Sequence, residues 1–232
     1  MDIDDAKIRD AVARTEIVRA PRQNLYTFGI TSIHYYLVTE PAYAEPSAEP
    51  AETVVREGKV IAERPRIVTP YYLSSLEGFS ENARRYFDQL QKKHGRNAPG
   101  LFYAYRNEPQ ALDIVANALP AVIEQLTSDI DQRGDPLTAL IRGIDELWDV
   151  ALIRFIYEVT SRSVATNIHE MGSRGLLSMD GRGVPVEARY RIEALLKKAE
   201  RGEADPRELK QELDRWGLFE EYEDRFFRLF GK

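Results

Sequence analysis

The chain has 232 residues, a net charge of −6 and 43% hydrophobic residues, and its acidic and basic side chains are well mixed. These values predict one large globular domain, or a domain with an appendage. They disfavour electrostatic binding of duplex nucleic acid and leave a local RNA contact open. The chain has no cysteine, which excludes disulfides and thiolate metal sites and agrees with the cytoplasmic location that we expect, and no apolar run of about 18 residues that would cross a membrane.

The first elements along the chain are a short helix and a strand. Residues 4–13 place Ile8, Ala11 and Val12 on one side, as a short amphipathic helix does. The run 29–39 is rich in β-branched and aromatic residues, and both of its alternating sets of side chains are largely apolar. A strand with two apolar faces is covered on both sides, so we expect this one inside the fold.

The next segments predict a small sheet. Two β-rich runs, 53–56 and 59–62, flank Glu57-Gly58, and a glycine at this place is typical of a two-residue hairpin turn. Residues 66–69 add a short strand, which gives three or four mostly antiparallel strands. Between the first strand and the hairpin, residues 40–52 hold three prolines, four glutamates and no basic residue. This composition predicts a solvated extended loop, and the alternative is a flexible acidic arm that meets a basic partner.

Beyond residue 80 the sequence predicts helices almost throughout. Ser80 is a candidate N-cap for a helix over 81–94 that Gly95 ends. A second helical pattern runs over 107–133, and Pro120 is expected to kink or split it.

The longest predicted helix covers residues 136–171. Asp135-Pro136 provides an N-cap followed by proline at the first helical position, which is a common helix start. Gly143 is expected to mark a bend or a close helix contact. A glycine-bearing connection follows over 172–185.

Three amphipathic helices are predicted at the C-terminus, over 186–201, 205–217 and 218–230. The predicted fold is therefore α+β, with a small, mostly antiparallel sheet near the N-terminus packed on a mainly α-helical domain and a C-terminal helical appendage. We expect a main domain over 1–175, with its sheet at approximately 28–70 and its helices at approximately 80–171, and a three-helix appendage over 186–232.

The long helix carries one polar stripe, formed by Arg154, Glu158, Arg162 and His169. At about 100° per residue these side chains fall within a narrow sector, and Glu158 and Arg162 have the favourable i,i+4 order of acid before base. One interpretation is a solvated stripe of ion pairs. The other is a buried polar cluster that lines a cleft.

The spacing of Arg162 and His169, with six residues between them, resembles the motif of HEPN ribonucleases. The resemblance covers eight residues; Ser163 stands where that motif has a polar residue after the arginine, and a sheet is not part of that all-helical family. It implies that the arginine binds a phosphate while the histidine moves a proton. The candidate catalytic residues are therefore Arg162, His169 and Glu158.

Other chemistry has weaker patterns. The three histidines do not cluster at metal-ligand spacing, so we expect no metal, and no cofactor motif or nucleophile signature occurs. The glycine-bearing segments 172–175 and 180–183 each hold an arginine, and they are either a phosphate cradle or helix caps with linker.

The C-terminal helix is rich in aromatic residues. One stripe of apolar side chains contains Phe219, Tyr222, Phe226 and Phe230, and Phe227 lies beside it. Such a helix either folds back on the preceding two helices or docks on another chain, and we expect docking. The leading functional hypothesis is a protein that binds other protein chains, through self-association or a partner, and the alternative is a nucleic-acid-processing or other hydrolytic enzyme.

Overall fold

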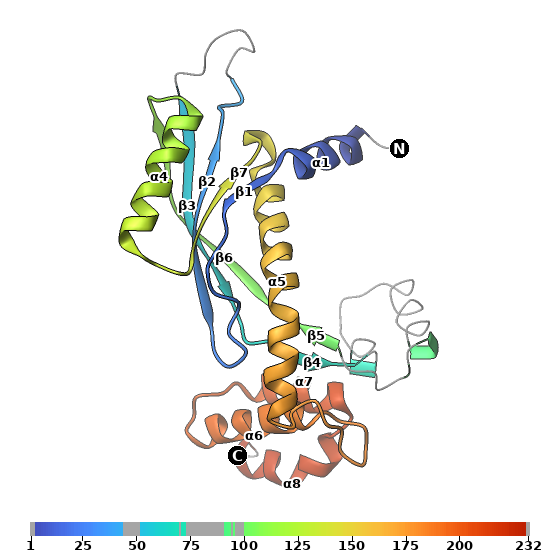
Figure 1. Cartoon of the computed structure of the whole chain (residues 1–232). Coiled ribbons are helices and arrows are strands. Elements are labelled where there is room, and N and C mark those ends of the chain that lie inside the picture. Colours follow the sequence, from blue (N-terminus) through green and yellow to red (C-terminus); the bar gives the residue numbers. More distant parts are fainter. Residues whose placement is uncertain are drawn as a thin grey trace. The chain divides into compact units, whose positions relative to one another are not determined.

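Figure 1 shows the computed structural model of the chain, which describes residues 3–43, 52–69, 71–72, 91–93, 95 and 100–230. The fold is α+β, as predicted, with its strands mainly towards the N-terminus. The chain forms two compact units, residues 1–64 with 103–167 and residues 65–102 with 168–232. The helices predicted over 186–232 lie in the second unit, and the domain boundaries drawn from the sequence stay a prediction.

A five-stranded sheet forms the centre of the first unit. Its order is β1 (Glu16–Arg19), β7 (Thr138–Arg142), β2 (Thr31–Thr39), β3 (Thr53–Ala62) and β6 (Tyr105–Val115). β2 and β7 run parallel and all other neighbours are antiparallel, which confirms the mostly antiparallel sheet. β2 lies in the middle of the sheet, as its two apolar faces predicted.

Two helices, α4 (Leu119–Arg133) and α5 (Trp148–Ser173), cover the two faces of this sheet (Figure 1). Phe155 of α5 shares one hydrophobic core with Leu37 of β2. Ile130 of α4 shares the other core with Val38, the next residue of the same strand. Because successive strand residues point to opposite faces, β2 contributes to both cores, and each large side chain buried there stabilises the fold by roughly 1.5–3 kcal/mol.

The N-terminal segment begins with α1 (Ile3–Arg14), which confirms the predicted short helix. β1 follows directly and was not predicted; it is short and pairs antiparallel with β7 at the sheet edge. In the acidic loop predicted over 40–52, Pro41 is buried, and residues 44–51 lie outside the described part of the chain.

The hairpin predicted over residues 53–62 is wrong, because these residues form the single strand β3. Gly58 lies inside that strand, where a Cβ atom would stand 2.5 Å from the hydroxyl oxygen of Tyr35 and 2.9 Å from the carbonyl oxygen of Glu108. The glycine therefore permits close approach of the neighbouring strands, next to a β-bulge, and makes no turn.

The helix predicted over residues 107–133 is wrong in its first part. β6 occupies that part and pairs with β3 along its length, and α4 begins only at Leu119. Pro109 is tolerated because β6 is an edge strand. Pro120 lies in the first turn of α4, where a missing N–H costs little, so it starts a helix and does not kink one.

The long helix predicted over residues 136–171 is also shorter than expected. Its first residues form β7, which is buried between β1 and β2. A short 3₁₀ helix, η1 (Asp145–Leu147), follows, and α5 begins at Trp148. An apolar run of about five residues does not distinguish a buried parallel strand from a buried helix by periodicity, so pairing with β2 decided this segment.

Asp135 and Gly143 both lie before α5, so Asp135 is not its N-cap, whereas Gly143 does make the close helix contact that was one of its two expectations. Asp135 accepts hydrogen bonds from the backbone N–H of Leu137 and the hydroxyl of Thr138, at 2.9 Å each, and so it closes a turn before β7. A Cβ atom on Gly143 would lie 2.8 Å from the Cβ atom of Ala151, so this glycine lets the chain end β7 close to α5.

The second unit contains a two-stranded antiparallel sheet and three C-terminal helices: β4 (Arg66–Val68), β5 (Gly100–Phe102), α6 (Val186–Glu200), α7 (Pro206–Trp216) and α8 (Phe219–Phe230). The three predicted helices are confirmed. Asp205 caps α7 by accepting the N–H of Arg207 at 2.8 Å, and Gly217 ends it with a φ of 64°. Of the helix predicted over 81–94, only residues 91–93 are described, and they are helical.

Candidate functional site

The polar stripe of α5 binds the backbone of the N-terminal segment. Arg162 donates through Nη2 to the carbonyl oxygens of Pro21 and Gln23, at 2.8 and 3.3 Å. Arg154 donates to the carbonyl oxygen of Thr15 at 3.0 Å and also contacts that of Val12. Within the described residues neither arginine has an ion pair with Glu158, so the stripe is not the ladder of ion pairs that one interpretation predicted.

Two buried polar residues of α5 extend this binding towards the end of the same segment. Ser163 accepts the backbone N–H of Leu25 at 3.0 Å, and Asn167 donates to the carbonyl oxygen of Leu25 at 3.0 Å and to the hydroxyl of Thr27. Buried polar side chains are stable only with such partners. The sequence holds a signal for them, because Ser163 and Asn167 are short polar residues at i,i+4 spacing on a largely apolar helix.

A small pocket of about 190 Å³ lies beside the stripe, within the first unit. It is lined by Ile17, Ala20, Phe155, Glu158, Val159 and Arg162. Two of the three candidate catalytic residues, Glu158 and Arg162, therefore meet at one pocket. Both are exposed, and Glu158 has no hydrogen-bond or ion-pair partner among the described residues.

His169 is not among the residues that line this pocket. It is an exposed residue of α5, seven residues beyond Arg162 in the sequence, and it belongs to the second unit. No hydrogen bond joins these two side chains in the described part of the chain. Over the same residues, no group of three or more histidine, aspartate or glutamate side chains is placed to hold a metal ion.

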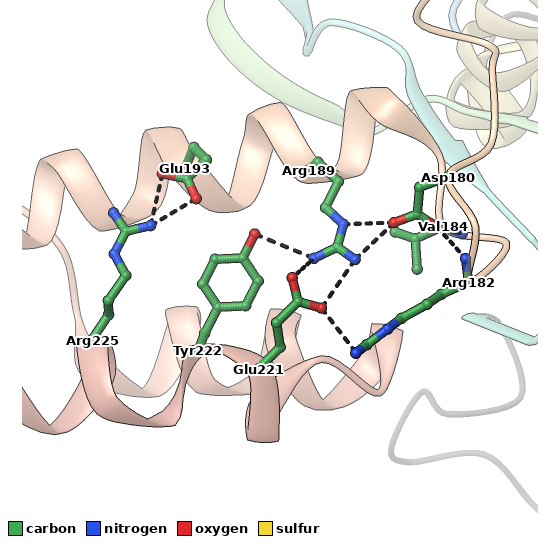
Figure 2. A network of polar contacts seen from close by, with 8 residues as sticks. All are labelled: Asp180, Arg182, Val184, Arg189, Glu193, Glu221, Tyr222 and Arg225. Atoms are coloured by element: carbon green, nitrogen blue, oxygen red, sulfur yellow. Dashed lines mark hydrogen bonds and ion pairs between the residues drawn. The ribbon is translucent and has the colours of Figure 1, made fainter.

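The glycine-bearing segment 180–183 forms a turn that its own aspartate stabilises (Figure 2). Asp180 accepts the backbone N–H groups of Arg182 and Val184 at 2.9 Å each. Arg189 of α6 donates to Asp180 and to Glu221 of α8, and Arg182 also binds Glu221. Burial alone would raise the pKa of Asp180, but the hydrogen bonds from Val184 and Arg189 outweigh it and hold this pKa below its usual range.

For the segment 180–183, this network favours the cap-and-linker interpretation over a phosphate cradle. Both arginines near the turn are engaged by carboxylates, and the backbone N–H groups of the turn point at Asp180 rather than at open space. The contacts tie the turn to α6 and α8, and Arg225 adds a second link between these helices through Glu193 at 2.8 Å. The cap-and-linker interpretation accounts for what the segment does.

The aromatic stripe of α8 packs against α6 and α7 in the core of the second unit. Tyr222 and Phe226 are each 8% exposed, and Phe219 and Phe230 are partly buried there. Phe227 is 53% exposed. Its ring packs edge-on against those of Phe219 and Phe226, with 6.2 and 5.7 Å between the ring centroids. Folding back on the preceding helices thus uses most of the stripe, and Phe227 is the candidate partner-binding residue that is left half exposed.

The outer edge of β6 is a further surface, and the sequence did not predict it. In the described part of the chain β6 pairs with β3 alone and ends the sheet. Leu112 and Ile114 of this strand are 60% and 55% exposed. Because they are two residues apart, they lie on the same face of the strand.

None of the protein-family models, curated proteins and solved structures compared with this chain matches it. No helix among the described residues is long and apolar enough to span a lipid bilayer.

Proposed function

We propose that this protein works by binding other protein chains, and that the free edge of β6 is a surface for such binding. The observation that carries the proposal is the change in character of this strand along its length. An exposed strand edge offers unpaired backbone N–H and C=O groups, and natural proteins usually protect such edges with proline, charge or a bulge.

The first half of β6 has all of these protections. Arg106 and Glu108 form an exposed ion pair at 2.7 Å, Pro109 lacks an N–H, and the register shifts opposite Gly58. The second half, residues 111–115, contains one charge, Asp113, and no proline or bulge. It is also the half that carries the exposed Leu112 and Ile114. An open and apolar edge of this kind suits an added strand.

The partner that fits this edge is an extended segment with apolar residues at alternate positions. Main-chain hydrogen bonds would give such a segment its affinity, and every second side chain would contact Leu112 and Ile114. A second copy of the chain fits less well. Five strand residues span roughly 17 Å, whereas stable interfaces use about 20–30 residues on each side.

The test compares two variants that each replace an exposed aliphatic residue by lysine. Leu112→Lys places a charge beside the edge of β6, and Ile153→Lys places one on the outer face of α5, where the isoleucine is 66% exposed. Proteins captured by the wild-type chain from its native source should be lost with Leu112→Lys and kept with Ile153→Lys. In the reconstituted complex, the amides of residues 111–115 should be protected from hydrogen exchange. Equal capture by both variants, or no protection of these amides, would refute the proposal.

The C-terminal helix is a second candidate surface for the same function. Phe227 offers a half-exposed aromatic ring, a residue type enriched in protein interfaces. Phe227→Ser should leave the fold intact and lower any self-association measured by light scattering. An unchanged mass and unchanged partners would show that Phe227 takes no part in binding other chains.

The hydrolytic alternative rests on Glu158 and Arg162, which line a common pocket, and it requires the RNA to lie over this pocket, because about 190 Å³ cannot enclose a nucleotide. It predicts cleavage of RNA that is lost in His169→Ala and in Glu158→Gln. Purified wild-type chain without such activity would remove this alternative and leave the binding proposal unaffected.

A further inference from the structure

The pocket beside α5 is too small for a nucleotide. Its volume of about 190 Å³ lies below the roughly 300–1,000 Å³ that are typical of sites for drug-sized ligands. It suits a body the size of one amino acid. Any ligand must therefore be recognised by the few side chains that line this space.

The buried part of the lining is apolar, and the exposed part carries the two charged residues Glu158 and Arg162. Phe155 and Val159 are buried in the core between α5 and the sheet, so their positions are fixed by packing. Ile17 adds an aliphatic wall from β1. This part of the lining offers contact to an aliphatic or similarly compact apolar group and no hydrogen bond.

The two charged residues of the lining do not pair with each other. Glu158 and Arg162 stand in an i,i+4 arrangement that normally allows an ion pair, yet none forms within 4.0 Å in the described part of the chain. The reason is that Nη2 of Arg162 donates to the carbonyl oxygens of Pro21 and Gln23. These two bonds orient the guanidinium, and its Nε and Nη1 atoms donate no hydrogen bond to a described residue. The pocket therefore presents a carboxylate acceptor and guanidinium donors side by side.

We propose that this pocket binds a small zwitterion with an apolar body, and that an α-amino acid with an aliphatic side chain is the ligand class that fits. The ammonium group would bind Glu158, the carboxylate would bind Arg162, and the side chain would rest on Phe155 and Val159. A simple anion would meet Glu158, and a simple cation would meet Arg162, so each would face one like charge. The zwitterion alone is complementary to both.

The experiment titrates the full chain with L-leucine by calorimetry or by NMR. Two analogues of similar shape each lack one charge: isocaproate has no ammonium group and isoamylamine has no carboxylate. Leucine should bind saturably, and each analogue should bind about 10–100-fold more weakly, the factor expected for one charge-assisted hydrogen bond. Failure of leucine and valine to bind up to their solubility limits, or equal binding of the analogues, would overturn the proposal.

Substitutions inside and outside the pocket test whether leucine binds there. Glu158→Gln should weaken leucine about tenfold or more and should not weaken isocaproate, because it removes the partner of the ammonium group and the like charge that isocaproate faces. Ala20→Leu fills the pocket from an exposed position and should abolish binding. Glu146→Gln, at an exposed glutamate outside the lining, is the matched control and should change nothing. Leucine binding that survives both pocket variants would place it elsewhere and refute the assignment. If Ala20→Leu fails to fold, Glu158→Gln decides, since the carboxylate of Glu158 has no partner among the described residues to lose.

Discussion

Replacing Glu212 by alanine should destabilise the second unit by about 3–5 kcal/mol, the cost of removing one partner from a buried ion pair. Glu212 is buried in α7, where its carboxylate accepts hydrogen bonds from Arg191 of α6 and Trp216 Nε1 at 3.0 Å, and from the Tyr72 hydroxyl at 3.1 Å. The variant leaves the buried guanidinium of Arg191 with Glu187, at 3.2 Å, as its remaining ion-pair partner in the described part of the chain. It also removes the acceptor of two further donors.

Urea unfolding measures this loss. In a Trp148→Phe background, the fluorescence of Trp216 reports on the second unit alone, because the chain has two tryptophans. Asp214→Ala is the control on the exposed face of α7, where Asp214 pairs with Lys210 at 2.6 Å, and it should cost under about 1 kcal/mol. If Glu212→Ala costs no more than this control, the buried network does not hold α6 and α7 together as argued.

Three further predictions concern single side chains. Burial raises the pKa of Tyr103 from 10.0 to about 12. The neutral Tyr103 side chain therefore contributes fully to stability below pH 10, and this contribution is lost as the pH rises towards 12. Tyr103→Phe should flatten the alkaline end of a plot of melting temperature against pH, and an unchanged slope would contradict this. Gly58→Ala should cost about 1–3 kcal/mol, since the new methyl group overlaps the Tyr35 hydroxyl, and a denaturant midpoint equal to that of the wild type would show that β2 and β3 can separate there. Phe226→Ala should cost about 3–5 kcal/mol and Phe227→Ala under about 1 kcal/mol, and similar costs for both would mean that Phe227 is covered.

The elements that the sequence predicted well are those whose signals are local. Asp205 and Gly217 bound α7 through the hydrogen bond and the left-handed backbone that their residue types favour. The run 29–39 is a central strand because both of its faces are apolar, a property of the run itself. The amphipathic patterns of α1, α6 and α8 likewise depend only on neighbours three and four residues away.

The candidate site was predicted in part. Arg154, Glu158 and Arg162 share one sector of α5, as helical spacing requires, and two of them line one pocket. What they bind was not predictable, because the carbonyl groups of Pro21 and Gln23 are about 140 residues away in the sequence. The same holds for Arg191 and Glu212, whose buried pairing joins two helices.

By itself, the sequence determined the α+β class, the strand core around β2 and the three C-terminal helices, because turns, caps and periodicity act over a few residues. Only the tertiary structure decided that residues 105–115 and 138–142 are strands, since an isolated strand has no internal hydrogen bonds and exists through its neighbours β3 and β2. It also decided that Gly58 and Gly143 serve close packing, that most of the α8 stripe lies within its own unit, and that β6 ends the five-stranded sheet in the described part of the chain. Each of these outcomes depends on which distant segment supplies the other side of a contact, and composition and spacing carry no information about that choice.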